Sequence, residues 1–214
     1  MEDWIARWRE GRIGFHEGRP NRLLECCVAR LADCRRVLVP LCGKAEDLAF
    51  LAAHGHDVLG VELAEQAVRG FFDEHGLVPS IAPHGPYTAY HAGAITLLAG
   101  DVFALTPELV APIDALYDRG ALIALPAELR PRYVALLGAV LPEAAPGLVV
   151  TVEYDPRAMA GPPFPVPEAE LRALYAGATI ELLGEQPVTT GKCAQLGVSA
   201  IERCFAIRPI RRSS

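Results

Sequence analysis

The sequence predicts a doubly wound α/β fold: a mostly parallel sheet with helices on both faces and an antiparallel strand at one edge. Short apolar runs typical of buried strands, including 37–41, 58–61 and 113–117, alternate with segments whose apolar residues recur at helical spacing. Strands that alternate with helices in this way form parallel sheets. The last two predicted strands, 179–183 and 200–207, have no predicted helix between them, so we expect them to supply the antiparallel edge.

The N-terminal elements have recognisable boundaries. Residues 2–9 predict a short helix with Trp4 and Trp8 one turn apart on the same face. Asn21 is suited to cap the helix that follows it, and Gly55 is suited to end the helix after the first strand. The remaining predicted elements are strand 58–61, a helix with Ala67, Val68, Phe71 and Phe72 facing inward, an irregular insertion at 76–93 that contains the start of a hairpin of 87–90 and 95–98, strand 113–117, helix 128–141, strand 147–154 and a Pro/Gly-rich loop at 155–167.

Composition limits the class of protein. The 214 residues carry a net charge of −6 and are 51% hydrophobic, which indicates one well-packed domain. Only Arg208, Arg211 and Arg212 form a basic cluster, so we expect no nucleic-acid partner. The acidic N-terminus and the short apolar runs predict a cytoplasmic protein that does not bind membranes. Six cysteines without a C-x-x-C pair predict free thiols and no metal site.

The turn after the first predicted strand points to a class of ligand. Glu62 ends the next strand nineteen residues after Gly43, which is the spacing of a βαβ unit whose acidic residue binds ribose hydroxyls. No G-x-G-x-x-G is present, and Glu46 and Asp47 open the following helix, where a pyrophosphate would need positive potential. A ligand with a ribose, a positive charge and no phosphate fits better, and S-adenosylmethionine is such a ligand. These observations disfavour a nicotinamide-dependent oxidoreductase, and Leu38 stands where a P-loop would begin with glycine.

Carboxylates occur at four of the five predicted strand ends. Ligands of open α/β sheets bind outside these ends, where carboxylates can accept hydrogen bonds from ribose hydroxyls and an exocyclic amine. Each residue also has a structural alternative. Gly43 can be an ordinary turn glycine, Glu62 or Asp101 can cap the next element, and Asp118 and Arg119 can form an exposed ion pair. The five strand ends are 41–44, Glu62, Asp101, Asp118–Arg119 and Tyr154–Asp155.

A series of motifs resembles the thiopurine S-methyltransferase family, from Trp4 to about residue 207. V-P-L-C-G-K and G-P-P-F are specific when they occur in this order, and the run D-R-G-A-L favours the thiopurine branch over related halide and thiol methyltransferases. The motifs are Trp4-x-x-x-Trp8, Ile13–His16, Val39–Lys44, Gly55–Glu62, Gly100–Phe103, Tyr117–Leu125 and Gly161–Val166.

The resemblance implies a seven-stranded, Rossmann-like sheet of the class I methyltransferases, with S-adenosylmethionine at its carboxyl edge. It implies methyl transfer to the sulfur of small aromatic or heterocyclic thiols, and bacterial relatives are also linked to selenium and tellurium compounds. It further implies a monomer, with residues 1–34 as an N-terminal helical lid of a single domain that spans 1–214. The alternative is a non-catalytic protein that binds S-adenosylmethionine as a sensor or partner subunit.

The same resemblance implies which residues form the site. No general base is required, because a heterocyclic thiol is largely ionised near neutral pH. The stretch 189–197 is shorter and less basic than the family pattern, which leaves the identity of the acceptor open. Cofactor contacts are expected at Trp8, Leu41, Gly43, Glu62, Asp101, Val102 and Arg119, acceptor contacts at Phe15 and Phe164, and positioning of the reactants by Arg119 and Asp118.

Overall fold

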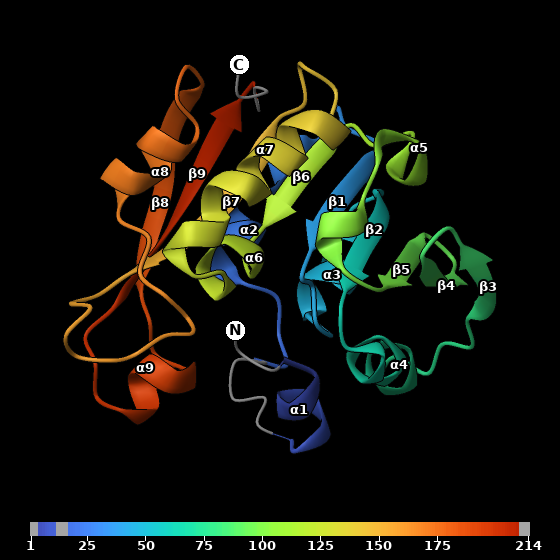
Figure 1. The fold of residues 1–214 in the computed structure, drawn as a ribbon, viewed down its shortest axis with the longest axis horizontal. Helices are drawn as coiled ribbons and strands as arrows, with labels where there is room; N and C mark the ends of the chain where they lie inside the picture. Colours follow the sequence, from blue (N-terminus) through green and yellow to red (C-terminus); the bar gives the residue numbers. More distant parts are fainter. Residues whose placement is uncertain (1–3, 12–16, 210–214) are drawn as a thin grey trace.

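The computed structural model describes residues 4–11 and 17–209, which form one mixed sheet of nine strands with helices on both faces (Figure 1). In spatial order the strands are β3 (Ser80–His84), β4 (Tyr87–Ala92), β5 (Ile95–Ala99), β2 (Asp57–Glu62), β1 (Arg36–Pro40), β6 (Ala115–Asp118), β7 (Gly147–Glu153), β9 (Ile201–Arg208) and β8 (Thr179–Pro187). The five strands from β5 to β7 are parallel. The pairs β7–β9, β8–β9, β4–β5 and β3–β4 are antiparallel.

This sheet confirms the predicted α/β fold, and the predicted hairpin strand β4 and the unexpected strand β3 extend it beyond seven strands. The seven strands from β5 to β8 correspond to the expected sheet with its antiparallel edge, and the predicted hairpin is confirmed as β4 and β5. β3 lies in the insertion 76–93, which we expected to be irregular. Its residues are mostly exposed and include Pro83, so it lacks the apolar run that marks a buried strand. A short helix, α9 (Gly191–Gln195), separates β8 from β9 against expectation, because five residues are too few to show helical periodicity.

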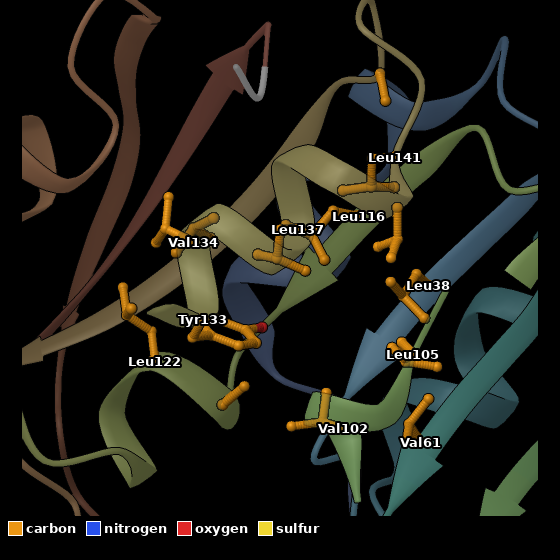
Figure 2. Close-up of a cluster of buried hydrophobic side chains, with 14 of the residues drawn as sticks. Leu38, Val61, Val102, Leu105, Leu116, Leu122, Tyr133, Val134, Leu137 and Leu141 are labelled. Carbon is orange, nitrogen blue, oxygen red and sulfur yellow. The ribbon is translucent and has the colours of Figure 1, made fainter. Parts of the chain in front are cut away.

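The helices pack on the two faces of the sheet as its alternating side chains require. On β1, Leu38 faces one apolar cluster, drawn in Figure 2, whereas Val37 and Val39 face the other. Within the described residues, no helix combines the length and hydropathy needed to cross a membrane. The Figure 2 face carries α5 (Pro107–Val110), α6 (Ala121–Ala124), α7 (Arg130–Val140) and α8 (Glu168–Leu174), and the opposite face carries α2 (Arg22–Cys27), the 3₁₀ turn Val28–Leu31, α3 (Glu46–Ala53) and α4 (Glu65–Glu74).

The predicted helix boundaries follow from local hydrogen bonding. The Asn21 side chain accepts a hydrogen bond from the Leu23 N–H at 2.9 Å and so caps α2, as predicted. Gly55 follows His54, the C-cap of α3, and has a φ of 91°, a conformation that favours glycine and ends the helix.

The segment 1–34 divides into two parts with different surroundings. The first helix, α1 (Trp4–Arg9), packs its buried Trp8 against Ala64 and Ala67 at the start of α4. In contrast, α2 and the 3₁₀ turn after it contribute Leu24 and Leu31, both fully buried, to the core. We therefore restrict the proposed lid to α1.

Gly60, in the middle of β2, tests how tightly the centre of the sheet is packed. A Cβ atom there would lie 2.5 Å from Leu97 Cδ2 and 2.8 Å from Cys42 Sγ, so we expect Gly60→Ala to lower the free energy of unfolding by about 1–3 kcal/mol. Gly70→Ala in α4 is the matched control. Its Cβ would make an ordinary contact of 3.7 Å with Lys44, and we expect a gain of up to about 1 kcal/mol. Equal urea-unfolding midpoints for the two variants would contradict the prediction.

Candidate functional site

A cavity of about 910 Å³ lies at the carboxyl edge of the parallel strands. Its wall contains Asp101, Glu62, Leu41, Arg119 and Val152, which lie at or just beyond the ends of β5, β2, β1, β6 and β7. The chain order reverses at β1, because β2 and β5 lie on one side of it and β6 and β7 on the other. Ligands of open α/β sheets bind above such a reversal, so the fold itself selects this cavity.

The turn that follows β1 has an unusual backbone. Leu41 has a φ of 48° and Gly43 a φ of 53°, both in the left-handed region. This conformation is strained for leucine but open to glycine. A Cβ atom on Gly43 would lie only 3.1 Å from Trp8 Cζ2, so the indole of α1 rests on the glycine. Gly43 therefore does more than allow a turn, since it also admits Trp8 at the cavity wall.

Glu62 holds this turn in place from the neighbouring strand. One carboxylate oxygen accepts a hydrogen bond from the Gly43 N–H at 2.9 Å, and the other accepts one from the Ala64 N–H at 2.8 Å. The side chain is buried, and burial raises the pKa of Glu62 above its ordinary value, although backbone hydrogen bonds from Ala64, Gly43 and Leu63 lower it. A carboxylate has about four lone-pair sites, so it can still accept a hydrogen bond from a ligand in the cavity.

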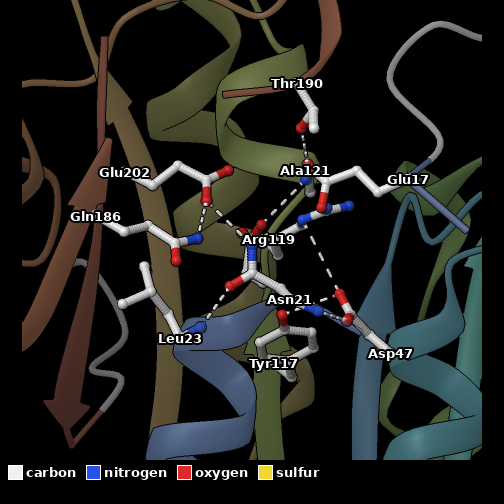
Figure 3. Close-up of polar contacts among 11 residues, drawn as sticks. Glu17, Asn21, Leu23, Asp47, Tyr117, Arg119, Ala121, Gln186, Thr190 and Glu202 are labelled. Atoms are coloured by element: carbon white, nitrogen blue, oxygen red, sulfur yellow. Dashed lines mark hydrogen bonds and ion pairs between the residues drawn. The ribbon is translucent and has the colours of Figure 1, made fainter. Parts of the chain in front are cut away.

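Arg119, after β6, lies between carboxylates rather than in the exposed pair with Asp118 that the sequence left open (Figure 3). Its Nη2 is 3.1 Å from Glu17 Oε2, and its Nε is 3.9 Å from Asp47 Oδ2. Burial alone would lower the pKa of Arg119, but the neighbouring anions, Asp47 foremost, raise it above its ordinary value. Asp47 is itself fixed by the Asn21 N–H at 2.7 Å and the Tyr117 hydroxyl at 3.0 Å.

Asp118 lies behind the cavity wall. It is fully buried and accepts hydrogen bonds from the N–H groups of Ala121 and Leu122 and from the Tyr133 hydroxyl. It therefore fixes the start of α6, next to Arg119, and is not among the residues that line the cavity. Any effect of Asp118 on bound reactants would act through this backbone.

Asp101 and Val102 line the end of the cavity above β5. The Asp101 side chain accepts a hydrogen bond from the Phe103 N–H at 2.9 Å, so its role as a cap is confirmed. The Arg132 guanidinium lies 4.3 Å from the centre of the Phe103 ring, and both residues belong to the same part of the wall. This end combines apolar surface with a carboxylate.

The opposite end of the cavity lies above β7 and β9. Phe164 lines it from the loop after β7, and its N–H donates to the Ile123 carbonyl at 2.7 Å. The Lys192 ammonium group, on α9, donates to the carbonyls of Ala160 and Pro162 in the same loop, at 2.5 and 3.3 Å. Three segments far apart in the sequence thus close this end: α6, the loop after β7, and α9.

The structure brings most of the predicted site residues together. Phe15 lies outside the described residues, and Asp118 lies behind the wall. Glu17, Asp47 and Lys192 also line the cavity but are absent from the predicted set, because nothing local in the sequence places them beside Arg119 or the Pro-rich loop. The predicted residues that line the cavity are Trp8, Leu41, Gly43, Glu62, Asp101, Val102, Arg119 and Phe164.

The strand order, with antiparallel β9 between β7 and β8, is the fold of the class I S-adenosylmethionine-dependent methyltransferases. Solved methyltransferases share this fold. The Burkholderia thailandensis 1,6-didemethyltoxoflavin-N1-methyltransferase, with bound 1,6-didemethyltoxoflavin and S-adenosylhomocysteine, superposes with a TM-score of 0.61 at 19% identity, over 97% of this chain and 85% of that one. The magnesium protoporphyrin IX methyltransferase of Synechocystis PCC 6803, with bound SAH, gives a TM-score of 0.58 at 16% identity, over 95% of this chain and 93% of that one.

Sequence comparison identifies the family within this class. The family model Thiopurine S-methyltransferase (TPMT) matches residues 1–208. The thiopurine S-methyltransferase of Pseudomonas entomophila (strain L48) is 45% identical over 213 residues, which cover 95% of this chain and 97% of the relative. That of Pseudomonas aeruginosa (strain UCBPP-PA14) is 53% identical over 176 residues, which cover 81% of each chain. The chain belongs to the thiopurine S-methyltransferase family.

Asp118 predicts a pH dependence of stability. Burial raises its pKa from 3.8 to about 6 although three hydrogen bonds lower it, so between these values the folded chain keeps a proton that the unfolded chain has lost. This contribution to the free energy of unfolding falls as the pH rises through the window and is lost above about pH 6. In Asp118→Asn the contribution is absent. We subtract the free energy of unfolding of the unsubstituted chain from that of the variant. This difference should be about 1 kcal/mol more favourable to the variant at pH 7.5 than at pH 5.

Urea unfolding at the two pH values measures this difference. Asp33→Asn, at an exposed position, is the control for effects of pH on the whole chain. A stability difference for Asp118→Asn that stays constant between pH 5 and pH 7.5 would show that Asp118 does not carry the effect.

Proposed function

We propose that the cavity binds S-adenosylmethionine above β2 and β1 and a small aromatic or heterocyclic thiol above β6 and β7, and that the chain transfers the methyl group to the sulfur of the thiol. The observation that carries this proposal is the buried Glu62 carboxylate, which keeps free lone pairs beside a turn that offers no cradle for phosphates. Family membership and the solved methyltransferases of this fold support the same reaction.

The residues of the cavity fit an adenosyl sulfonium. Glu62 suits the two ribose hydroxyls, while Asp101 and Val102 suit an adenine at the end above β5. Glu46 and Asp47 stand in the first turn of α3, where they favour a cation and disfavour a pyrophosphate. S-adenosylmethionine, when bound, supplies a methyl group that its sulfonium already activates.

The chain contributes alignment and exclusion of water. Arg119 is fixed by two carboxylates and a buried strand end, and Phe164 is fixed by its loop, so neither needs to reorganise during transfer. Such positioning can lower a barrier by roughly 7–11 kcal/mol. We propose no general base, because a heterocyclic thiol is largely ionised near neutral pH. The helix α1, with Trp8 on Gly43, acts as the lid over the cofactor end.

Three further features belong to the same proposal. Selenium and tellurium compounds are candidate acceptors, because they are soft nucleophiles like a thiolate. The free thiols of the six cysteines support a reducing, cytoplasmic setting. We also propose a monomer, which light scattering of the purified chain would test.

Transfer of a labelled methyl group tests the proposed activity directly. With labelled S-adenosylmethionine and either 6-mercaptopurine or benzenethiol, we expect the labelled thioether to form. Binding of S-adenosylmethionine without transfer to any thiol, selenide or telluride would instead support the sensor as the function of this chain.

Glu62→Ala tests the cofactor end of the cavity. Because the carboxylate is the buried acceptor for a ribose and also fixes Gly43, we expect S-adenosylmethionine to bind about tenfold or more weakly, as measured by calorimetry. Glu108→Ala, on the exposed side of α5, is the matched control and should keep the original affinity. Unchanged affinity of folded Glu62→Ala would remove Glu62 from the site.

A further inference from the structure

The charge of Arg119 is already balanced by the protein. Two carboxylates lie within 4 Å of its guanidinium: Glu17 at 3.1 Å and Asp47 at 3.9 Å (Figure 3). The guanidinium thus lies between two acidic side chains on the wall of the cavity. Arg119 therefore does not present an unpaired cation to a molecule in the cavity, although it lines the wall.

The two carboxylates differ in what else they do. Asp47 is buried and accepts hydrogen bonds from the Asn21 N–H and the Tyr117 hydroxyl, so it is part of the framework. Glu17 is about one-fifth exposed at its side chain, at 18%, and its other oxygen accepts a hydrogen bond from the Thr190 hydroxyl at 2.8 Å. Glu17 is thus the more accessible of the two anions.

The Thr190 contact places Glu17 towards the end of the cavity that Phe164 lines. We call this the acceptor end, because we propose that the thiol binds there. Thr190 directly precedes α9, and Lys192 of this helix holds the loop that carries Phe164. Glu17 and these residues line the same cavity. An acceptor beside Phe164 would therefore lie near the Glu17 carboxylate in a partly desolvated site, where a second negative charge is repelled more strongly than in water.

We propose that Glu17 is a specificity-determining residue that disfavours thiol acceptors carrying an additional carboxylate. This inference rests on the proposed thiol methylation. Together with Asp47, Glu17 weakens the attraction of Arg119 for such a carboxylate, and it adds a like charge that opposes it. The Lys192 ammonium group at this end is already engaged by the carbonyls of Ala160 and Pro162. Acceptors of the same shape that lack the additional carboxylate are not repelled by Glu17.

Glu17→Gln isolates the charge. The glutamine has nearly the same size, and the negative charge is lost. Its amide oxygen can accept from Arg119, and its NH2 group can donate to the Thr190 hydroxyl, which accepts as well as donates. The acceptors are 4-mercaptobenzoate and 4-mercaptobenzamide, which have the same shape and differ by one charge. We expect the ratio of kcat/KM for the acid to kcat/KM for the amide to rise by about tenfold in Glu17→Gln.

Two control variants separate charge from structure. Thr190→Val removes the hydrogen bond but leaves the Glu17 charge, so the acid-to-amide ratio should stay close to its original value. Glu181→Gln breaks an exposed ion pair with Arg30 outside the cavity and should change neither the ratio nor the activity. An unchanged ratio in Glu17→Gln, or an equal rise in Thr190→Val, would overturn the proposal.

A binding measurement keeps this test independent of turnover. With S-adenosylhomocysteine present, calorimetry of benzoate and benzamide should show that Glu17→Gln strengthens binding of benzoate relative to benzamide. If the chain transfers no methyl group to either thiol but this shift appears, the proposed reaction fails, while Glu17 still disfavours a carboxylate in the cavity. If transfer occurs but neither the kinetic ratio nor the binding ratio shifts, only the role of Glu17 fails.

Discussion

The site depends on two hydrogen bonds that converge on the Glu62 carboxylate. They join the turn after β1 to the start of α4, through the N–H groups of Gly43 and Ala64. Burying a carboxylate is costly, and charge-assisted hydrogen bonds from two backbone donors offset part of that cost. The same bonds stabilise a turn in which Leu41 adopts a strained left-handed conformation. Both surfaces on which Trp8 rests, at Gly43 and Ala64, are therefore set by Glu62.

The position of this carboxylate follows from the topology. β1 has β2 on one side and β6 on the other, so the polypeptide leaves the centre of the sheet in opposite directions. The loops after these strands diverge, and the space between them becomes the cavity. Gly120 lies close to this point, because a Cβ atom there would be 3.1 Å from the Leu41 carbonyl oxygen. The ends of β1 and β6 can approach so closely because a glycine follows Arg119.

Apart from the residues that the family resemblance implies, what the sequence predicts about the site is local in the chain. Glu62 and Gly43 are separated by one βαβ unit, so their spacing alone indicates that they meet. Glu17 and Thr190 are 173 residues apart, and no local pattern relates them. Asp118 and Glu62 are both carboxylates at strand ends, yet one lies behind the wall and the other faces the cavity. That difference depends on Tyr133 and on the start of α6, which only the folded chain brings to Asp118. β3 escapes prediction for a related reason, since an exposed edge strand needs no apolar run.

The charges around Arg119 suit a reaction in which charge disappears. A thiolate and a sulfonium are oppositely charged, and methyl transfer between them gives two neutral products. A strong, unpaired cation beside the sulfur would stabilise the thiolate before the reaction more than during it, which would slow transfer. Arg119, already paired with Glu17 and Asp47, can hold the wall in position without competing in this way. Polar groups that balance one another thus supply rigidity at this wall of the cavity without an unpaired positive charge at Arg119.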